Sequence, residues 1–355
     1  IYIEGNQHLS ARKINRAMKK TNESGNILNI FSAKKFVKNL YEADKVAVVD
    51  KYNEIGYRDA YIESDTVKKY NDKKVDVYLK IVEGKKYFFR DIKWVGNTIY
   101  SSELLNQMLR IKRGDVYNAK LLNDRLMMDE DAVSNLYQDN GYLFFNVDPV
   151  EVSIDGDSID YEMRIYEGKQ AVINKIGIEG NTKLYEHVVR RELRTKPGQL
   201  YNKSDIIRTI RELAQMNQFD PEKIVPDIQP DPENGTVDIT YKLETKSSDQ
   251  VELSAGYGYT GLTGSLGLTF KNFAIENIFK PKTYKIVPQG EGQTFSLKGS
   301  TNGRYYTSLS ASFIDPWFGK KRPNSFSVSV YHSRMSGVSD RYSEAYGPSY
   351  NPYST

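Results

Sequence analysis

A Gly-Asn pair that directly follows a strand pattern occurs three times in the first 246 residues, and its spacing constrains the fold more than any other feature. The copies are Gly5-Asn6, Gly96-Asn97 and Gly180-Asn181. Each copy follows β-branched or aromatic residues and precedes a helical pattern. Gly and Asn both tolerate the positive φ of a tight turn from a strand into a helix. A turn that repeats at near-regular intervals predicts an array of similar domains.

Other residues repeat with the same period. The pairs that lie 84 or 85 positions apart are Gly96 and Gly180, Gly114 and Gly198, Tyr117 and Tyr201, Gly56 and Gly141, and Glu83 and Glu167. The interval from Gly5 to Gly96 is longer, at 91 positions, and we place an insertion near residues 21–31. We therefore predict three domains, at residues 1–85, 86–169 and 170–246.

Each domain has the pattern of a strand, two helices and two strands, which predicts an α+β fold. In the second domain we expect a strand at Phe88–Val95 and a helix capped by Ser101 or Ser102. One further helix is expected over the apolar residues from Leu121 to Tyr137. The closing strands of the second and third domains are expected at Leu143–Val147, Ser158–Glu167, Ile224–Ile228 and Thr236–Leu243.

A three-stranded sheet leaves an unpaired strand edge, and such an edge can add an extended peptide as a further strand. The candidate edges are Arg58–Ser64, Leu143–Val147 and Ile224–Ile228. The residues that we expect to offer these edges are Asp59, Ala60, Tyr61, Ile62, Leu143, Phe144, Phe145, Val147, Ile224, Val225 and Ile228. An equally weighted alternative is that the edges pair with neighbouring domains or are covered.

Near residue 246 the pattern changes to strict alternation. Alternating runs occur at Val251–Tyr259, Leu262–Phe270, Thr294–Gly299, Thr307–Phe313 and Phe326–Val330. One face of each run is apolar or aromatic, and the other is mostly Ser, Thr and Gly. A soluble sandwich would also alternate, but a small, nearly uncharged polar face favours a transmembrane β-barrel. Bacterial barrels need at least ~8 strands, so residues 247–355 are predicted to hold only the first strands of an antiparallel barrel.

Composition excludes several classes of function. A net charge of +4 gives no strong field for binding nucleic acid. The absence of cysteine excludes a disulfide scaffold, a thiolate metal site and a cysteine nucleophile. No apolar run approaches the ~18 residues that a transmembrane helix needs. Because the chain starts at Ile1 without a signal peptide, we interpret it as an excerpt of a longer precursor.

No residue pattern predicts catalysis, a cofactor or a metal, so we expect a protein that is not an enzyme. His8, His187 and His332 lie in three different units and form no ligand pair. The glycines of Gly256–Gly261 match G-x-G-x-x-G, but a dinucleotide loop must open a helix, and here strand patterns flank it. No G-x-S-x-G elbow supports a hydrolase.

Three charged or irregular segments carry no chemical signal. The acidic run Asp129–Asp131 is interpreted as a solvated helix face. The basic run Lys320–Arg322 is interpreted as a polar turn, with contact to lipid headgroups as the less favoured alternative. Residues 272–293 are too long for a tight turn, and the sequence assigns them no role.

Together these motifs resemble a known family. The repeat resembles the POTRA domain, in which Gly-Asn follows the first strand, Gly-Tyr follows the second helix and Glu-Gly closes the unit. The segments Val251–Tyr259, Gly264–Phe270 and Phe313–Phe318 resemble the opening barrel strands of the outer-membrane protein insertases of Gram-negative bacteria. The third unit departs from the repeat, with Asn217–Asp220 in place of Gly-Tyr, as in the membrane-proximal POTRA domain of that family.

The resemblance implies a mechanism and a location. POTRA domains of such proteins lie in the periplasm, and the barrel lies in the outer membrane. The first barrel strand acts as a lateral gate that pairs with client strands; its residues here would be Val251, Glu252, Leu253, Ser254, Ala255, Gly256, Tyr257, Gly258 and Tyr259. The implied partners are unfolded outer-membrane β-barrel proteins, accessory lipoproteins of an assembly complex and the lipid bilayer, without nucleic acid and without a cofactor.

Three alternatives remain open at this point. A TamA-like translocation and assembly factor has the same parts but fewer POTRA domains. A phospholipase carried on a POTRA-linked barrel would need a Ser-Asp dyad. A secretion pore would export a single partner.

Overall fold

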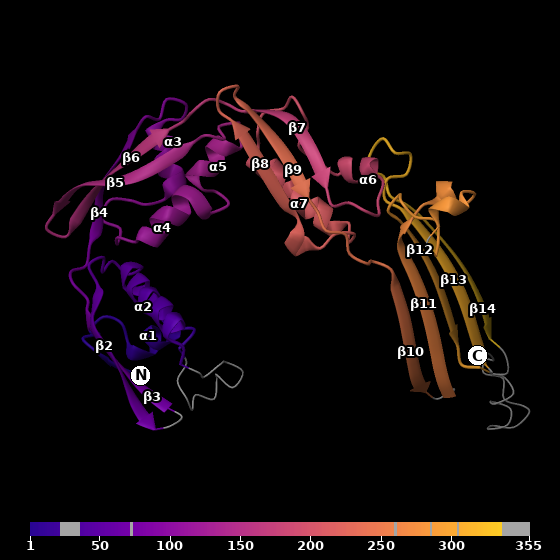
Figure 1. Cartoon of the computed structure of the whole chain (residues 1–355), viewed down its shortest axis with the longest axis horizontal. Coiled ribbons are helices and arrows are strands. Elements are labelled where there is room, and N and C mark those ends of the chain that lie inside the picture. The colour runs from indigo at the N-terminus through magenta and orange to yellow at the C-terminus, as the bar shows by residue number, and fades with distance from the viewer. Residues whose placement is uncertain (22–35, 72–73, 259–260, 285, 304, 336–355) are drawn as a thin grey trace, which may run out of the picture. The chain divides into compact units, whose positions relative to one another are not determined.

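The computed structural model describes residues 1–21, 36–71, 74–258, 261–284, 286–303 and 305–335 (Figure 1). The insertion expected near residues 21–31 lies, from residue 22 onward, outside these described residues. The chain divides into two compact units, Ile1–Ala171 and Val172–Thr355. Among the described helices, none combines the length and the apolar character needed to cross a membrane.

The first unit begins with a three-stranded sheet covered by two helices. Its elements are β1 (Tyr2–Glu4), α1 (Ala11–Ala17), α2 (Lys38–Asn53), β2 (Tyr61–Asn71) and β3 (Lys74–Val82). The strand order is β1-β3-β2, with β3 parallel to β1 and antiparallel to β2. The sheet therefore has two edges, β1 and β2. Ile14, Tyr52 and Leu79 meet in the buried core between the helices and the sheet.

The second sheet of the same unit repeats this topology with the order β4-β6-β5. Its elements are β4 (Phe88–Val95), α3 (Ser102–Leu109), α4 (Ala119–Asn123), the π-helical turn η2 (Asp124–Met128), α5 (Val133–Gln138), β5 (Asn146–Asp155) and β6 (Ser158–Tyr166). The strand at Phe88–Val95 is as expected. The Ser101 side chain caps α3 by accepting a hydrogen bond from the Leu104 amide, as predicted.

The single helix expected from Leu121 to Tyr137 is wrong, because the helix breaks after Met128. The acidic run Asp129–Asp131 forms a turn here and not a helix face. Arg125 holds this turn, pairing with Asp129 at 3.2 Å and with Asp131 at 3.1 Å. Short helices thus cover the sheet where the hydrophobic period alone indicated one long helix.

The Gly-Asn turn has a steric cause that is the same in all three copies. Gly5, Gly96 and Gly180 have φ values of 83°, 91° and 79°. A Cβ atom at Gly96 would lie 2.3 Å from the carbonyl oxygen of Ile165, on the central strand, and the other two glycines face the same clash. Only glycine fits a backbone that approaches another backbone so closely. Each following Asn then donates to the carbonyl three residues ahead, as Asn97 does to Tyr100 O at 2.9 Å.

The Glu-Gly pair closes each of the first two domains by holding the loop that follows the turn. Glu167 accepts hydrogen bonds from the amides of Thr98 and Ile99 at 2.9 and 3.0 Å. Glu83 accepts one from His8 N at 3.0 Å. The third domain lacks this glutamate, and a hydroxyl pair, Thr182 with Thr245 at 2.8 Å, stands in its place.

The second unit contains a third such sheet, with the order β7-β9-β8. Its elements are β7 (Val172–Glu179), α6 (Glu186–Arg190), α7 (Lys203–Gln215), η3 (Pro221–Lys223), β8 (Val225–Asp231) and β9 (Thr236–Lys242). Its buried residues include Val188 and Val189 of α6, Leu213 of α7 and Tyr241 of β9.

An antiparallel five-stranded sheet follows in the same unit, with its strands in chain order (Figure 1). Its strands are β10 (Gln250–Gly258), β11 (Gly261–Phe273), β12 (Gln293–Thr301), β13 (Tyr306–Asp315) and β14 (Phe326–Met335). Two short turns, η4 (Ile275–Asn277) and η5 (Pro281–Thr283), lie between β11 and β12. The strand count matches the sequence prediction, although the described strands form an open sheet and not a closed barrel.

The strand register sorts this sheet into two faces. Leu253 lies opposite Leu266, and Leu268 lies opposite Leu297. On the other face, Ser254 lies opposite Ser265, and their hydroxyl groups are 2.5 Å apart. Opposite residues of antiparallel strands share a face, so one face is apolar and the other carries mainly Ser, Thr and Gly.

Candidate functional site: free strand edges and the end of the sheet

Strand β10 offers one long side of backbone for pairing. It pairs with β11 over its whole length, and within the described part of the chain no strand lies on its other side. Its apolar side chains are open to solvent, with Leu253 77% exposed and Tyr257 87% exposed. The predicted gate residues Val251 to Gly258 all lie in this strand or in its pairing register, whereas Tyr259 lies outside the described residues.

Neither Gly256 of β10 nor Gly264 of β11 is required by a close steric contact. A Cβ atom added at Gly256 or at Gly264 would meet nothing within 4 Å. Ala255 lies opposite Gly264, and Gly258 lies opposite Gly261, so this end of the hairpin has few side chains to pack across the strands. Because cross-strand side-chain pairs stabilise sheets, this part of β10 is held weakly. The G-x-G-x-x-G pattern of Gly256–Gly261 begins in β10 and ends in the antiparallel strand β11. A dinucleotide loop would instead lead from a strand into a helix.

The predicted edge of the first domain begins later than expected. Asp59 and Ala60 precede β2, and Tyr61 and Ile62 are its first residues. Asp59 accepts a hydrogen bond of 2.6 Å from the Tyr87 hydroxyl of the next domain. Arg58 pairs with Glu151 of β5 at 2.7 Å. The neighbouring domain therefore holds the start of this segment, and the edge strand runs from Tyr61 to Asn71.

The other two predicted edges are also shifted toward the C-terminus. Leu143, Phe144 and Phe145 precede β5, and Phe145 is buried with its ring stacked on Tyr137 at 4.1 Å. The amide of Phe145 donates to Tyr142 O, which makes this stretch a turn. Val147 lies in β5. In the third domain, Ile224 is buried and precedes β8, which contains Val225 and Ile228.

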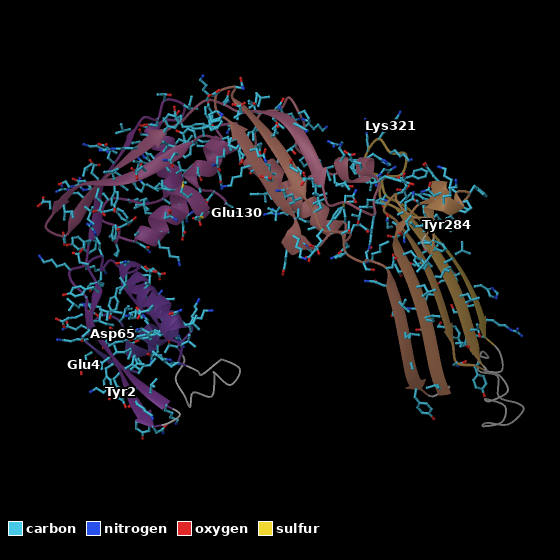
Figure 2. The ribbon with its side chains drawn as sticks, in the orientation of Figure 1. Tyr2, Glu4, Asp65, Glu130, Tyr284 and Lys321 are labelled. Atoms are coloured by element: carbon cyan, nitrogen blue, oxygen red, sulfur yellow. The ribbon has the colours of Figure 1, made fainter. Side chains whose placement is uncertain are left out.

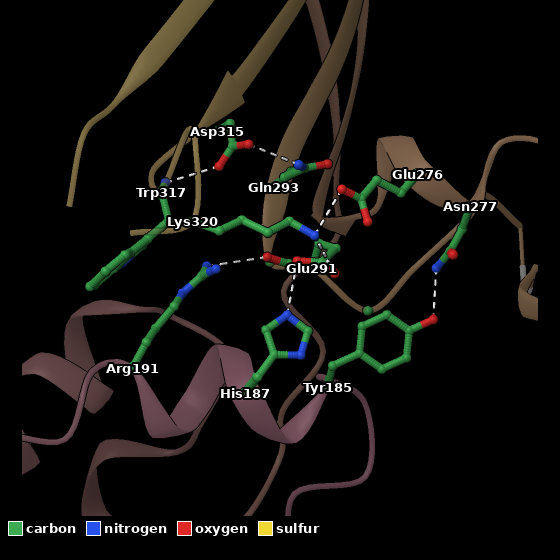
Figure 3. Close-up of polar contacts among 12 residues, drawn as sticks. Tyr185, His187, Arg191, Glu276, Asn277, Glu291, Gln293, Asp315, Trp317 and Lys320 are labelled. Carbon is green, nitrogen blue, oxygen red and sulfur yellow. Dashed lines mark hydrogen bonds and ion pairs between the residues drawn. The ribbon is translucent and has the colours of Figure 1, made fainter. Parts of the chain in front are cut away.

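A partly buried polar network joins the α6 region to one end of the five-stranded sheet, and no sequence pattern predicted it (Figure 3). The Tyr185 amide donates to Gly290 O at 2.9 Å, and Gly290 lies so close to the Tyr185 ring that a Cβ atom would be 2.6 Å from it. Asn272 is buried and donates to Lys183 O at 3.0 Å. Residues 272–293, to which the sequence assigned no role, thus attach the sheet to the third domain.

Further polar and ionisable side chains take part in this network. His187 Nε2 lies 3.3 Å from Glu291 Oε2, and Lys320 Nζ lies 3.8 Å from Glu291 Oε1. Trp317 Nε1 donates to Glu192 Oε1 at 2.6 Å, and the Arg191 guanidinium lies over the Trp317 ring. Burial raises the pKa of Glu192, and the bond from Trp317 only partly offsets this effect. Burial likewise lowers the pKa of Arg191.

Metal chemistry has no candidate among the described residues, which contain no group of three His, Asp or Glu side chains that could hold an ion. His8 contacts Glu83 at 2.5 Å, and His187 contacts Glu291, so both have structural partners. The structural features that can carry a function are therefore the strand edges, the apolar face of the five-stranded sheet and the polar network that joins the sheet to the third domain.

Comparison with known families decides the identity of the repeat. The family model for POTRA, described as a surface antigen variable number repeat, matches residues 1–84, 87–168 and 171–246. This chain belongs to the POTRA family. The matched residues cover the three repeated sheets and stop before β10.

Curated proteins that are similar in sequence to this chain are named as outer membrane protein assembly factors. An outer membrane protein assembly factor BamA from Neisseria meningitidis is 28% identical over 331 residues, which is 90% of this chain and 38% of its own length. A BamA from Nitratidesulfovibrio vulgaris is 24% identical over 278 residues, 78% of this chain and 33% of its own. The chain thus spans about a third of the length of these curated relatives. The resemblance to the insertase family that the motifs indicated is confirmed by these relatives.

Two solved structures share the fold. A crystal structure of POTRA domains 3–5 of Haemophilus influenzae BamA has a TM-score of 0.55 at 24% identity, covering 68% of this chain and 94% of that one. Haemophilus ducreyi BamA lacking POTRA domains 1–3 has a TM-score of 0.56 at 22% identity, covering 70% of this chain and 43% of that one.

Proposed function

We propose that this chain belongs to the central component of an outer-membrane protein assembly machine, which folds and inserts β-barrel proteins, with its POTRA domains in the periplasm. On this proposal, residues 250–335 are the first strands of a transmembrane β-barrel. Two findings support the proposal. The chain belongs to the POTRA family, and similar proteins are named as outer membrane protein assembly factors.

The observation that carries the proposal is the apolar face of the five-stranded sheet, which no other described element covers. Leu253, Leu266 and Val330 lie on it and are exposed. A sheet in water buries such a face against another layer, and contiguous exposed apolar patches mark contact with a protein or a membrane. The opposite face carries small polar residues, which suits the lumen of a barrel.

Strand β10 would then act as the gate. An incoming client strand can replace one set of backbone hydrogen bonds with an equivalent set, so the exchange requires no nucleotide. The weak side-chain packing around Gly256 lowers the cost of opening this end of the hairpin. The client is an unfolded β-barrel protein, and a lipid bilayer receives the product.

The POTRA edges would serve as secondary binding strands. Within the described residues, β2, β5 and β8 each pair with another strand on one side only, whereas β4 and β7 are bridged on their outer side by Val116 and Leu200. Extended segments of clients or of accessory lipoproteins can add to such edges. Nothing in this role requires a catalytic residue or a cofactor.

Reconstitution tests the proposed function. The full-length protein is placed in phospholipid vesicles, and an unfolded outer-membrane β-barrel protein is added. Folding of the client is followed by its resistance to protease and compared with vesicles that hold an unrelated barrel. Acceleration of client folding supports the proposal. Equal rates in the two kinds of vesicle would exclude a role in assembly.

A further inference from the structure

Hydrogen bonds hold the described residues between β11 and β12 against the end of the sheet. Asn277 is buried and donates both to the Tyr185 hydroxyl at 2.8 Å and to Gln289 O at 3.1 Å (Figure 3). The Tyr284 hydroxyl donates to Ile278 O at 2.5 Å. These bonds tie Asn277 to α6 and to the end of the loop, and tie Tyr284 to Ile278.

The loop begins on the apolar side of the sheet. Phe273 packs on the rings of Phe295 and Phe313, which lie on the apolar face. Gln293 lies two residues before Phe295 and so points to the same side, where its Oε1 accepts from the Ile275 amide at 2.8 Å. The side of the sheet that would face lipid is therefore the side that carries this loop.

Apolar and cationic side chains project together from the loop. Phe279 is 93% exposed and Ile286 is 78% exposed, and Ile278 is exposed as well. Lys280 and Lys282 are exposed in the same segment. A loop that presents a phenyl ring and branched aliphatic groups to water is unfavourable unless another phase receives them.

A second loop adds to this surface. Lys320, in the turn after β13, pairs with Glu276 at 2.8 Å and so ties the two loops together. Phe318 is half-exposed, and Lys321 and Arg322 are exposed without an ion-pair partner among the described residues. Figure 2 places Lys321 and Tyr284 at the same end of the sheet.

We propose that these two loops form a membrane-interface anchor. It binds the phospholipid surface of the leaflet at the end of the sheet that contacts the third POTRA domain. Phe279 and Ile286 would insert among the acyl chains, and Lys282, Lys321 and Arg322 would meet the lipid phosphates. Aromatic groups and long cationic side chains are the residues that settle at this depth of a bilayer. Because Tyr185 and Asn277 link the loop to α6, the anchor also holds the third POTRA domain near the membrane. This inference rests on the proposed function.

Spin labels at single cysteines test the anchor in the full-length protein in vesicles of phosphatidylethanolamine and phosphatidylglycerol. The chain has no cysteine of its own, so each introduced thiol is unique within it. The three positions are Phe279→Cys in the loop, Val330→Cys on the apolar face of β14 and Leu200→Cys on the third POTRA domain. The readout is the collision rate of each label with oxygen, which concentrates in acyl chains, and with a water-soluble nickel complex.

The expected result is that the labels at 279 and 330 collide more often with oxygen, and that the label at 200 shows the reverse order. Exchanging Lys282, Lys321 and Arg322 together for Gln should lower the oxygen preference at 279. Lys298→Gln, on β12, should leave it unchanged.

The outcomes separate the two proposals. If 330 prefers oxygen but 279 behaves like 200, the anchor is wrong and the membrane sheet stands. If 279 is shielded from both reagents, a protein covers the loop, and the anchor is again wrong. If 330 itself prefers the nickel complex, the sheet is not in the bilayer and the proposed function fails.

Discussion

The indole Nε1 of Trp317 donates a hydrogen bond of 2.6 Å to the carboxylate of Glu192. This bond links the turn after β13 to the residues that follow α6, 125 positions earlier in the chain. The third POTRA domain and the five-stranded sheet are thus joined by side chains as well as by the backbone.

Glu192→Gln should change how stability depends on pH. Burial raises the pKa of Glu192 in the folded protein, so folding is favoured most below the unfolded pKa and loses this contribution as pH rises through the folded pKa. Gln keeps an acceptor for Trp317 and carries no charge. We expect the variant to lose this pH dependence and to be as stable as wild type, or more so, at neutral pH, measured by hydrogen exchange of the α6 amides.

Glu192→Ala is the matched control. It removes both the charge and the acceptor, so the buried end of the indole loses its partner at a cost of roughly 1–2 kcal/mol. If Ala and Gln have the same effect, the hydrogen bond contributes nothing to docking.

Glu167→Gln should destabilise the second domain, and its pH dependence should be opposite to that of Glu192, because the pKa of Glu167 is lowered. Burial alone would raise the pKa of Glu167, but bonds from Thr98, Ile99 and Tyr137 lower it below its usual value. Its contribution is therefore present above the unfolded pKa and is lost as pH falls through the folded pKa. The variant should be less stable by roughly 1–3 kcal/mol at neutral pH, with the difference from wild type shrinking in acid. Urea denaturation at several pH values measures this, and a pH-independent difference would contradict it.

Gly96→Ala should destabilise the second domain more than Gly114→Ala. Both glycines have positive φ, at 91° and 89°, so both substitutions carry a backbone cost of about 1–2 kcal/mol. Only Gly96 also places the new methyl group 2.3 Å from Ile165 O, whereas nothing lies within 4 Å of a Cβ atom at Gly114. Thermal unfolding of the two variants compares them directly. Equal losses would show that the close approach to Ile165 can relax without cost.

Gly256→Val should stabilise β10 and slow client assembly. The side chain enters open space and gains a cross-strand contact with Thr263, which is worth about 0.2–1 kcal/mol. Exchange of the β10 amides should slow, and client folding in vesicles should slow with it. If amide exchange slows while the rate of client folding is unchanged, opening of β10 does not limit client assembly, and the gate proposal is wrong.

Sequence periodicity predicted the repeated sheets because their causes are local. Gly96 is required by one steric contact, and Glu167 by the amides of one loop, so both leave a mark at fixed spacing. The five alternating strands were predictable for the same reason, since side chains alternate between the two faces of a sheet.

The polar network that joins α6 to the five-stranded sheet was not predictable from such patterns. Tyr185 and Gly290, or Glu192 and Trp317, are about a hundred or more positions apart and follow no period. The edges were misplaced because apolar residues such as Phe145 resemble strand residues but are buried in turns. The break after Met128 depends on ion pairs of Arg125, which a hydrophobic period does not record.

Site-specific cross-linking tests the central claim, that β10 receives client strands. Cysteines at Glu252 and Gly256 in β10, and at the control position Ser296 in β12, are placed one at a time in the full-length protein during assembly of a client that carries a cysteine in its terminal strand. Strand β12 is paired on both sides, with β11 and β13, so it has no free edge. We predict disulfide cross-links to the client from 252 and 256 and none from 296. Cross-links from 296 that equal or exceed those from β10 would show that β10 is not the strand that receives the client.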